Sequence, residues 1–475
     1  MSIVSFNFFV FITLFFIIYY VIPSKYQWYC LLIMSILFYL INTQKNTVWL
    51  MFTIIGTYLF TNVIEDLKEK NATNAQIRLL FIINIIIALS PLLLLKYIIG
   101  SVYASIALPM GISFYTLQLI GYSVDVYKGK FKAEHNLLKY MLFAMFFPQI
   151  IQGPIARYDK LSESLYKPHN FEEDKITKGF MLVLWGLFLK LVLADHAAVI
   201  VDTVFNDYKI YTGFYILIAG VLYSIQLYAD FMGCVCIAKG ISSMFGVELM
   251  DNFNHPYFAN SIKDFWRRWH ISLSSWLRDY IYIPLGGNRK GAVPKYINLI
   301  ITFIVSGLWH GVGLQFIFWG VLHGMYQIIG DLTQNIRTKC KTILHIKGTF
   351  IDSACQRIFT FVLVMLAWIF FRAASFQQGI EMVVLMIKDF NIKNWKGGAL
   401  FQLGLSQKDC IVLAICILLL ILVSLLQEKI CIREIILRFP IITRYMIYVI
   451  VICAILVFGI YGSGYDARAF IYGGF

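Results

Sequence analysis

Two histidines lie inside hydrophobic sequence, and each has tryptophan next to it. His270 ends the segment 264–270 (DFWRRWH), and His310 lies in the segment 307–311 (GLWHG), at the end of a long apolar run. An ionisable group at membrane depth is costly and needs a partner, a water-filled cavity or a function. Because imidazole titrates near neutral pH, it is suited to general acid–base catalysis. We therefore take these two histidines as candidate catalytic residues.

The residues around His270 have the spacing of an amphipathic helix over residues 264–280. At about 100° per residue, the polar side chains share one arc and the aromatic side chains fill the opposite side. Such a helix either lies in the membrane interface or lines a polar cavity, and periodicity leaves both open. A basic wall of this kind can hold an anionic group such as the phosphates of a coenzyme. The polar arc consists of Asp264, Arg267, His270, Ser274 and Arg278.

Composition predicts that the chain lies in a membrane. Of its 475 residues 60% are hydrophobic, whereas soluble domains average about 45–50%. We expect an all-α integral membrane protein with about 10–12 transmembrane helices and further re-entrant or interfacial helices. The chain is interpreted as a single polytopic domain over residues 1–475. Its net charge is +14, but the basic residues fall in short loops, which indicates contact with membrane lipid and not with nucleic acid.

The loop between the third and fourth apolar runs predicts the orientation of the chain. It contains Lys68, Lys70 and Arg78, and loops rich in lysine and arginine stay on the cytoplasmic side. This places the N-terminus outside. Residues 1–22 carry no charge and lack the basic segment and cleavage site of a signal peptide, so they are interpreted as a retained first span.

Motifs for metal or cofactor chemistry are missing from the sequence. It has no nucleophile elbow, Walker loop, HExxH motif or dinucleotide fingerprint. Cys234 and Cys236 lie two residues apart, without the second pair or histidine cluster that a zinc site needs. We expect neither a metal nor a bound cofactor. The glycines beside His310 should let helices approach closely and leave room for a substrate, and His323 is interpreted as structural.

Several short motifs, taken together and in this order, resemble the membrane-bound O-acyltransferase family. They are LPMGISFY (108–115), VDVY (124–127), FPQ (147–149), GPI (153–155), RY (157–158), NF (252–253), PY (256–257), FWRRWHISLS (265–274), RDYIYIPLGG (278–287), GLWHG (307–311) and FFRA (370–373). The resemblance covers residues 108–373 and is closest to the bacterial branch that acetylates alginate, peptidoglycan and other polysaccharides. Each motif is weak by itself, but their order is highly specific.

The resemblance implies a ring of helices around a funnel through the bilayer, with the active histidine in its constriction. His310 matches the family's catalytic histidine, and His270 matches the second histidine of this branch. The implied reaction moves an acyl group from a cytoplasmic thioester, acetyl-CoA or an acyl carrier thioester, to a hydroxyl. Members of this branch work with an extracytoplasmic SGNH-type protein that acetylates a polysaccharide. The chain is therefore expected to be an O-acetyltransferase of the bacterial cell membrane.

Within this reaction we expect His310 to accept the proton of the attacking hydroxyl and His270 to polarise the thioester carbonyl or orient an intermediate. A positioned base contributes roughly 10²–10⁴-fold to a rate, and a preorganised donor at the carbonyl oxygen should matter as much. Arg267 and Arg268 would hold the helix or attract donor phosphates. The residues expected to support the site are Asp264, Arg267, Arg268, Trp269, Ser274, Arg278 and Trp309.

Two other functions remain open at this point. Transfer of D-alanine from a carrier protein to teichoic acid uses the same scaffold, although the run YIPLGG (282–287) favours the acetylating branch. A non-catalytic transporter or scaffold of the same export pathway is the second, because Cys236 stands where related proteins carry a carboxylate. If the chain is an enzyme, Asp230 is the candidate to replace that carboxylate.

Overall fold

The computed structural model describes residues 1–99, 108–211, 213–390, 401 and 403–461, and its regular structure in this part is helical. Nine of the helices described are long and apolar enough to cross a membrane, and α1 is a shorter apolar helix. The all-α, multi-pass membrane class predicted from composition is thereby confirmed. The nine segments are Ser24–Thr43, Thr47–Glu69, Asn74–Ile98, Glu173–Asn206, Gly213–Met244, Ala292–His310, Phe350–Arg372, Gln407–Gln427 and Ile441–Phe458.

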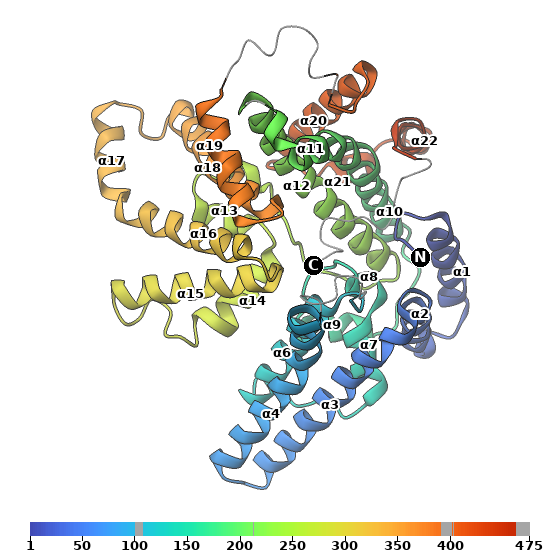
Figure 1. Cartoon of the computed structure of the whole chain (residues 1–475). Helices are drawn as coiled ribbons and strands as arrows, with labels where there is room; N and C mark the ends of the chain where they lie inside the picture. The colour runs from blue at the N-terminus through green and yellow to red at the C-terminus, as the bar shows by residue number, and fades with distance from the viewer. Residues whose placement is uncertain (100–107, 212, 391–400, 402, 462–475) are drawn as a thin grey trace. The chain divides into compact units, whose positions relative to one another are not determined.

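Figure 1 shows the helices in chain order. They are α1 (Phe6–Val21), α2 (Gln27–Thr43), α3 (Thr47–Glu69), α4 (Asn74–Leu92), α6 (Ile112–Tyr127), α7 (Leu137–Met145), α8 (Phe147–Ile150), α9 (Tyr158–Leu165), α10 (Glu173–Leu187), α11 (Asp195–Asn206), α12 (Gly213–Met244), α13 (Ile262–Arg268), α14 (Ile271–Leu277), α15 (Ala292–His310), α16 (Leu314–Leu332), α17 (Gln334–Ile343), α18 (Phe350–Arg372), α19 (Phe376–Lys388), α20 (Gln407–Gln427), α21 (Ile432–Leu437) and α22 (Ile441–Phe458). Short π-helical segments η3 (Leu93–Ile99), η4 (Phe188–Ala194) and η7 (Arg278–Tyr282) extend three of them.

Contacts divide the described chain into two compact units. Of the described residues, one unit contains Met1–Gly186 and Cys234–Met250, and the other contains Leu187–Gly233 and those between Asp251 and Tyr461. Helix α12 contributes its first turns to the second unit and its last turns to the first. The organisation of residues 1–475 as one domain stays a prediction.

The first unit is built on α3, α4 and α6. Helices α3 and α4 are joined by a short loop and run side by side, and α6 packs against both (Figure 1). Helix α4 begins with a capping box, in which the Thr73 side chain accepts from the Gln76 backbone and the Gln76 side chain accepts from Thr73. This arrangement satisfies two backbone donors at the start of the helix.

Residues 137–152 are apolar enough to predict a further span, but in the structure this run is broken. Helix α7 ends at Met145, and the four-residue helix α8 begins at Phe147. Pro148 explains the break, because proline has no backbone N–H to donate to the carbonyl of Ala144 and its ring clashes with that carbonyl. The run therefore forms two short helices.

The second unit has α15, α16 and α18 at its centre, and α13 packs against α16 and α18. Its core is rich in tryptophan. The ring of Trp319 lies 5.7 Å from that of Trp266 and 5.7 Å from that of Trp368, with which it stacks. Both candidate histidines lie in this unit, against the same aromatic core.

Candidate active site

Helices α15 and α16 place His310 by an unusually close approach of their backbones. A Cβ atom on Gly307 would lie 2.2 Å from the carbonyl oxygen of Phe316, and a Cβ on Gly320 would lie 2.2 Å from that of Phe303. Only glycine fits at either position, so the predicted close helix contact is confirmed. The expected room for a substrate is not found at Gly311, where a Cβ would lie 2.2 Å from the Phe316 ring.

His310 is the last residue of α15, and its side chain is 1% exposed. Aromatic rings surround it: the Trp319 and Phe371 rings each lie 5.1 Å from the imidazole, and the Trp309 ring lies 4.8 Å away. The C-terminal end of a helix carries a partial negative charge. His310 thus lies in an apolar shell, at the end of a helix whose dipole attracts cations.

The predicted helix over residues 264–280 is interrupted at His270. Helix α13 ends at Arg268, His270 has left-handed backbone angles (φ 44°, ψ 55°), and α14 begins at Ile271. The backbone groups at the break bond to a neighbouring segment: Asn254 N donates to Arg268 O, and Ile271 N donates to Asn252 O, both at 2.9 Å. The single helical arc inferred from periodicity was therefore wrong.

Asn252 determines which nitrogen of His270 carries the proton. Its Oδ1 accepts from the Ser272 backbone N at 3.1 Å and from Ser272 Oγ at 2.9 Å, and it lies 3.2 Å from His270 Nδ1. A backbone N–H can only donate, so the Asn252 atom that faces it is an oxygen. His270 Nδ1 must then be the protonated nitrogen, which leaves a lone pair on Nε2 of the neutral ring.

The charge state of His270 follows from its burial. The side chain is 1% exposed, and desolvation lowers the pKa of His270 to about 3. The ring is therefore neutral near pH 7. A neutral imidazole with its hydrogen on Nδ1 accepts at Nε2 and cannot donate there, so the expected polarisation of a carbonyl by His270 does not fit this geometry.

Trp309 connects the two histidines. Its ring centroid lies 6.1 Å from that of His270 and 4.8 Å from that of His310. Phe231 lies edge-on to His270 at 4.8 Å. Of the residues predicted from the sequence, the structure thus brings His270, Trp309 and His310 into one buried cluster.

The other predicted site residues have separate partners. Asp264 pairs with Arg268 on α13 at 3.2 Å, and Arg278 pairs with its neighbour Asp279 at 2.9 Å. The buried Trp269 accepts a hydrogen bond at its carbonyl from Ser274 Oγ at 3.1 Å. The basic wall expected on one arc is not formed, and Arg267 and Arg278 are exposed.

Asn252 is the site residue that sequence reasoning missed. It appeared only as the first residue of the NF motif (252–253) and was given no role. Side-chain periodicity relates residues within one helix, whereas Asn252 reaches His270 from a separate segment. The sequence did contain one indication of its role, because Asn252 is a polar residue in the motif that precedes the segment of His270.

His323 lies close to this cluster, on α16. Its Nδ1 accepts a hydrogen bond from Trp266 Nε1 at 3.2 Å, and the side chain is fully buried. This bond ties α13 to α16. The structural interpretation of His323 is in keeping with this contact.

A buried charged cluster lies elsewhere in the second unit. Lys190, on η4, is 2.8 Å from Asp230 Oδ1 and 2.9 Å from Asp195 Oδ1. Asp230 had been the candidate to replace the carboxylate expected at Cys236. The structure pairs Asp230 with Lys190, and the side chain that orients His270 is Asn252.

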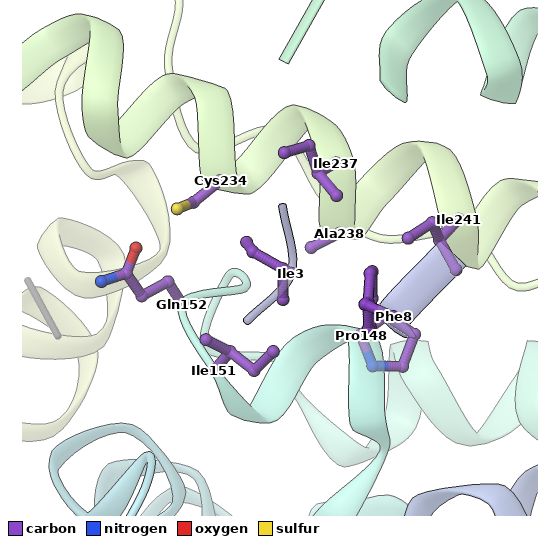
Figure 2. A pocket seen from close by; sticks show the side chains of 9 residues that line it. All are labelled: Ile3, Phe8, Pro148, Ile151, Gln152, Cys234, Ile237, Ala238 and Ile241. Carbon is purple, nitrogen blue, oxygen red and sulfur yellow. The ribbon is translucent and has the colours of Figure 1, made fainter. Parts of the chain in front are cut away.

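The structure offers little for a metal or cofactor in the part that it describes. No group of three or more His, Cys, Asp or Glu side chains in this part could hold a metal ion. A cavity in the first unit, between α8 and the last turns of α12 (Figure 2), has room for about one water molecule. It is lined by Ile3, Phe8, Pro148, Ile151, Gln152, Cys234, Ile237, Ala238 and Ile241. A reaction without metal or bound cofactor stays a prediction.

The sequence that contains this site matches a known protein family. The family model of membrane-bound O-acyltransferases matches residues 31–376, a stretch that contains Asn252, His270 and His310. The chain belongs to the membrane-bound O-acyltransferase family. The resemblance seen in the ordered motifs is thereby confirmed.

Individual relatives narrow the comparison. The chain is 38% identical over 320 residues to a probable alginate O-acetylase of Pseudomonas aeruginosa, which covers 67% of this chain and 58% of the relative. It is 32% identical over 376 residues to the peptidoglycan O-acetyltransferase of Helicobacter pylori, which covers 70% and 69%. It is 29% identical over 262 residues to the teichoic acid D-alanyltransferase of Bacillus subtilis, which covers 51% and 65%. The match thus spans less than two thirds of the alginate relative.

Proposed function

We propose that this protein is an O-acetyltransferase that acts on a cell-wall or extracellular polysaccharide. Its membership of the acyltransferase family and the names of its relatives support the reaction class. The observation that carries the proposal is the buried pair His270 and His310, which share contact with Trp309. Two imidazoles in an aromatic shell provide proton acceptors that bulk water does not reach.

The proposed reaction transfers an acetyl group from the thioester of acetyl-CoA to a hydroxyl. The hydroxyl oxygen bonds to the carbonyl carbon while its proton passes to His310. The carbon–sulfur bond then breaks, and the proton returns to the leaving thiolate, so the products are an ester and a free thiol. His270, with its lone pair on Nε2, would accept a hydrogen bond from the attacking hydroxyl and orient it.

The donor and the acceptor lie on opposite sides of the cell membrane in this proposal. The thioester is cytoplasmic and the polysaccharide is outside, so the acetyl group crosses the bilayer within the protein. An extracytoplasmic SGNH-type partner would receive the group and pass it to the glycan. The multi-pass helical architecture supports this path.

The test is acetyl transfer by the full chain in nanodiscs together with an SGNH-type partner, measured with radiolabelled acetyl-CoA and a polysaccharide acceptor. We expect His310→Ala to lower the rate by roughly 10²-fold or more, because the base is lost. His270→Asn is the better second variant, since asparagine tolerates the left-handed backbone at this position. His135→Ala, at an exposed histidine of the first unit, is the matched control and should keep the native rate.

Three results would overturn the proposal. An unchanged rate in His310→Ala would show that His310 is not the general base. Transfer of D-alanine from a carrier protein, with acetyl-CoA ignored, would assign the chain to the teichoic acid reaction named for one of its relatives. Donor uptake into vesicles that survives loss of both histidines would favour a transporter.

A further inference from the structure

Helix α17 is amphipathic, and both of its faces are exposed. At about 100° per residue, Ile336, Cys340 and Ile343 fall within one narrow arc. The opposite arc holds asparagine, glutamine and threonine side chains. Ile336 is 65% exposed and Ile343 is 74% exposed. An aqueous surface rarely carries such an apolar stripe without a partner.

The charges of α17 border its apolar arc. Arg337 lies on one side of the arc and Lys339 on the other, which is the arrangement of a helix that lies flat in a membrane surface. Residues 334–349 contain four basic residues and no acidic one. Long basic side chains at such positions keep their stems in the apolar layer and their charges among headgroups.

Two contacts fix α17 at the end of a membrane-spanning helix. Lys341 Nζ lies 2.6 Å from Asp352 Oδ1 in the first turn of α18, and Arg337 Nη2 donates to the carbonyl of Gly330 on α16 at 2.5 Å. Figure 1 shows α17 between α16 and α18 along the chain. Because α18 is a candidate span, its first turn marks the membrane boundary, and α17 lies next to it.

We propose that α17 lies in the plane of the membrane surface and binds anionic phospholipid headgroups through Arg337 and Lys339. The arc of Ile336, Cys340 and Ile343 then enters the upper acyl region. The charge of α17 favours lipid as the partner of this surface, because a basic helix without acidic residues complements an anionic leaflet. The proposal concerns a surface distinct from the histidine cluster, and it holds for any reaction performed there.

Cys340 provides a native probe in the centre of the apolar arc. The experiment uses the full chain with the other exposed thiols removed (Cys355→Ser, Cys431→Ser and Cys453→Ser). A fluorophore on Cys340 is placed in phosphatidylcholine nanodiscs that contain either brominated phosphatidylglycerol or brominated phosphatidylcholine at the same mole fraction. We expect stronger quenching by the brominated phosphatidylglycerol, and high salt should reduce the difference.

The double variant Arg337→Gln/Lys339→Gln tests the role of charge. Each basic residue near an anionic surface contributes about fivefold to the preference, so removing both should lower the preference for phosphatidylglycerol roughly 25-fold. The control, Lys388→Gln/Lys408→Gln, removes the same charge from exposed positions of α19 and α20 and should leave the preference unchanged.

Three outcomes would overturn the proposal. Equal quenching by the two brominated lipids shows that the helix does not select headgroups. Absence of quenching by either lipid places the arc in water or against protein. Loss of the preference for phosphatidylglycerol when coenzyme A is added shows that the basic residues bind donor phosphates and not lipid.

Discussion

Asn252 gives His270 a single chemical role near neutral pH. The backbone N–H of Ser272 can only donate, so it fixes the orientation of the Asn252 amide with the oxygen toward it. The same oxygen accepts the hydrogen bond from His270 Nδ1. Because the Asn252 amide is neutral, it does not stabilise the protonated form of His270, and the imidazole stays weakly basic. A carboxylate there would instead stabilise the imidazolium.

Replacing Asn252 separates its structural and electrostatic roles. Asn252→Asp keeps the acceptor but adds a negative charge beside Nδ1, which raises the pKa of His270. The acidic limb of the pH–rate profile should therefore move to higher pH, because the ring protonates earlier as the pH falls. Asn252→Leu removes the acceptor and should cost about 1–3 kcal/mol of stability for each buried donor left unpaired.

The measurements are the pH dependence of kcat/KM and the midpoint of thermal unfolding. Ser272→Ala is the control, because it removes one donor and leaves the contact between Asn252 and His270. A pH profile of Asn252→Asp that superimposes on the native profile would show that the reaction does not require a neutral His270.

Residue types in the sequence singled out His270, Trp309 and His310, which the structure brings into one buried cluster, because an ionisable imidazole is rare and costly in an apolar run. They were not sufficient to find Asn252. An asparagine has many ordinary positions in loops, and its contact with His270 depends on a turn that breaks the predicted helix. The charged residues near His270 were grouped by a periodicity that ends at that turn.

At the scale of elements, the contact between α15 and α16 holds His310 in place. The close approach depends on Gly307 and Gly320, each facing a backbone carbonyl of the other helix. A backbone cannot move aside as a side chain does. Any side chain at either position must therefore separate the helices and shift the end of α15.

Gly307→Ala should lower both stability and activity. The added methyl group would lie 2.2 Å from Phe316 O, and overpacking of this kind costs typically about 1–3 kcal/mol. Gly330→Ala, on α16, is the matched control because nothing lies within 4 Å of its Cβ. That variant should be neutral or slightly stabilising, since alanine favours a helix. Thermal unfolding and the transfer rate check both, and equal behaviour of the two variants would contradict the packing argument.

The buried cluster of Lys190, Asp195 and Asp230 should respond unequally to loss of its members. Lys190→Met leaves two buried carboxylates without their cation, and breaking such a cluster costs about 3–5 kcal/mol. Asp230→Asn keeps the pair of Lys190 and Asp195 and should cost much less.

Lys209→Met is the control for Lys190, because Lys209 is exposed and lies 3.9 Å from the half-buried Glu381, and ion pairs at the surface contribute about 0–1 kcal/mol. Unfolding of the four proteins can be followed by a thiol-reactive dye, since several cysteines are buried in the native state. A Lys190→Met protein as stable as the native one would show that the carboxylates are neutral or otherwise compensated.

At the scale of the whole molecule, the hydrophobic runs correctly predicted an all-α protein with several membrane-spanning helices. A span needs only about 20 apolar residues, and this signal is local. Runs such as 137–152 failed because Pro148 breaks the helix within an apolar segment. The division into two units could not be predicted, since it depends on contacts between segments far apart in the sequence, such as Met1–Gly186 and the last turns of α12.

The basic loop after α3 leads to a prediction of topology. With Lys68, Lys70 and Arg78 inside, the N-terminus lies outside. A cysteine introduced at Asn74, exposed at the start of α4, should react with a membrane-impermeant maleimide only after permeabilisation. A cysteine at Ser2 should react in intact cells, in a background without the native exposed thiols. The opposite labelling pattern would reverse the orientation.

The left-handed backbone at His270 has a consequence for the history of this family. Histidine, asparagine and aspartate tolerate this conformation better than most residues do, and their codons differ by a single nucleotide. A lineage can therefore exchange His270 for asparagine and keep the break between α13 and α14. The fold would persist while the proposed role of the imidazole was lost, so a descendant inactivated by this exchange would differ at this one position.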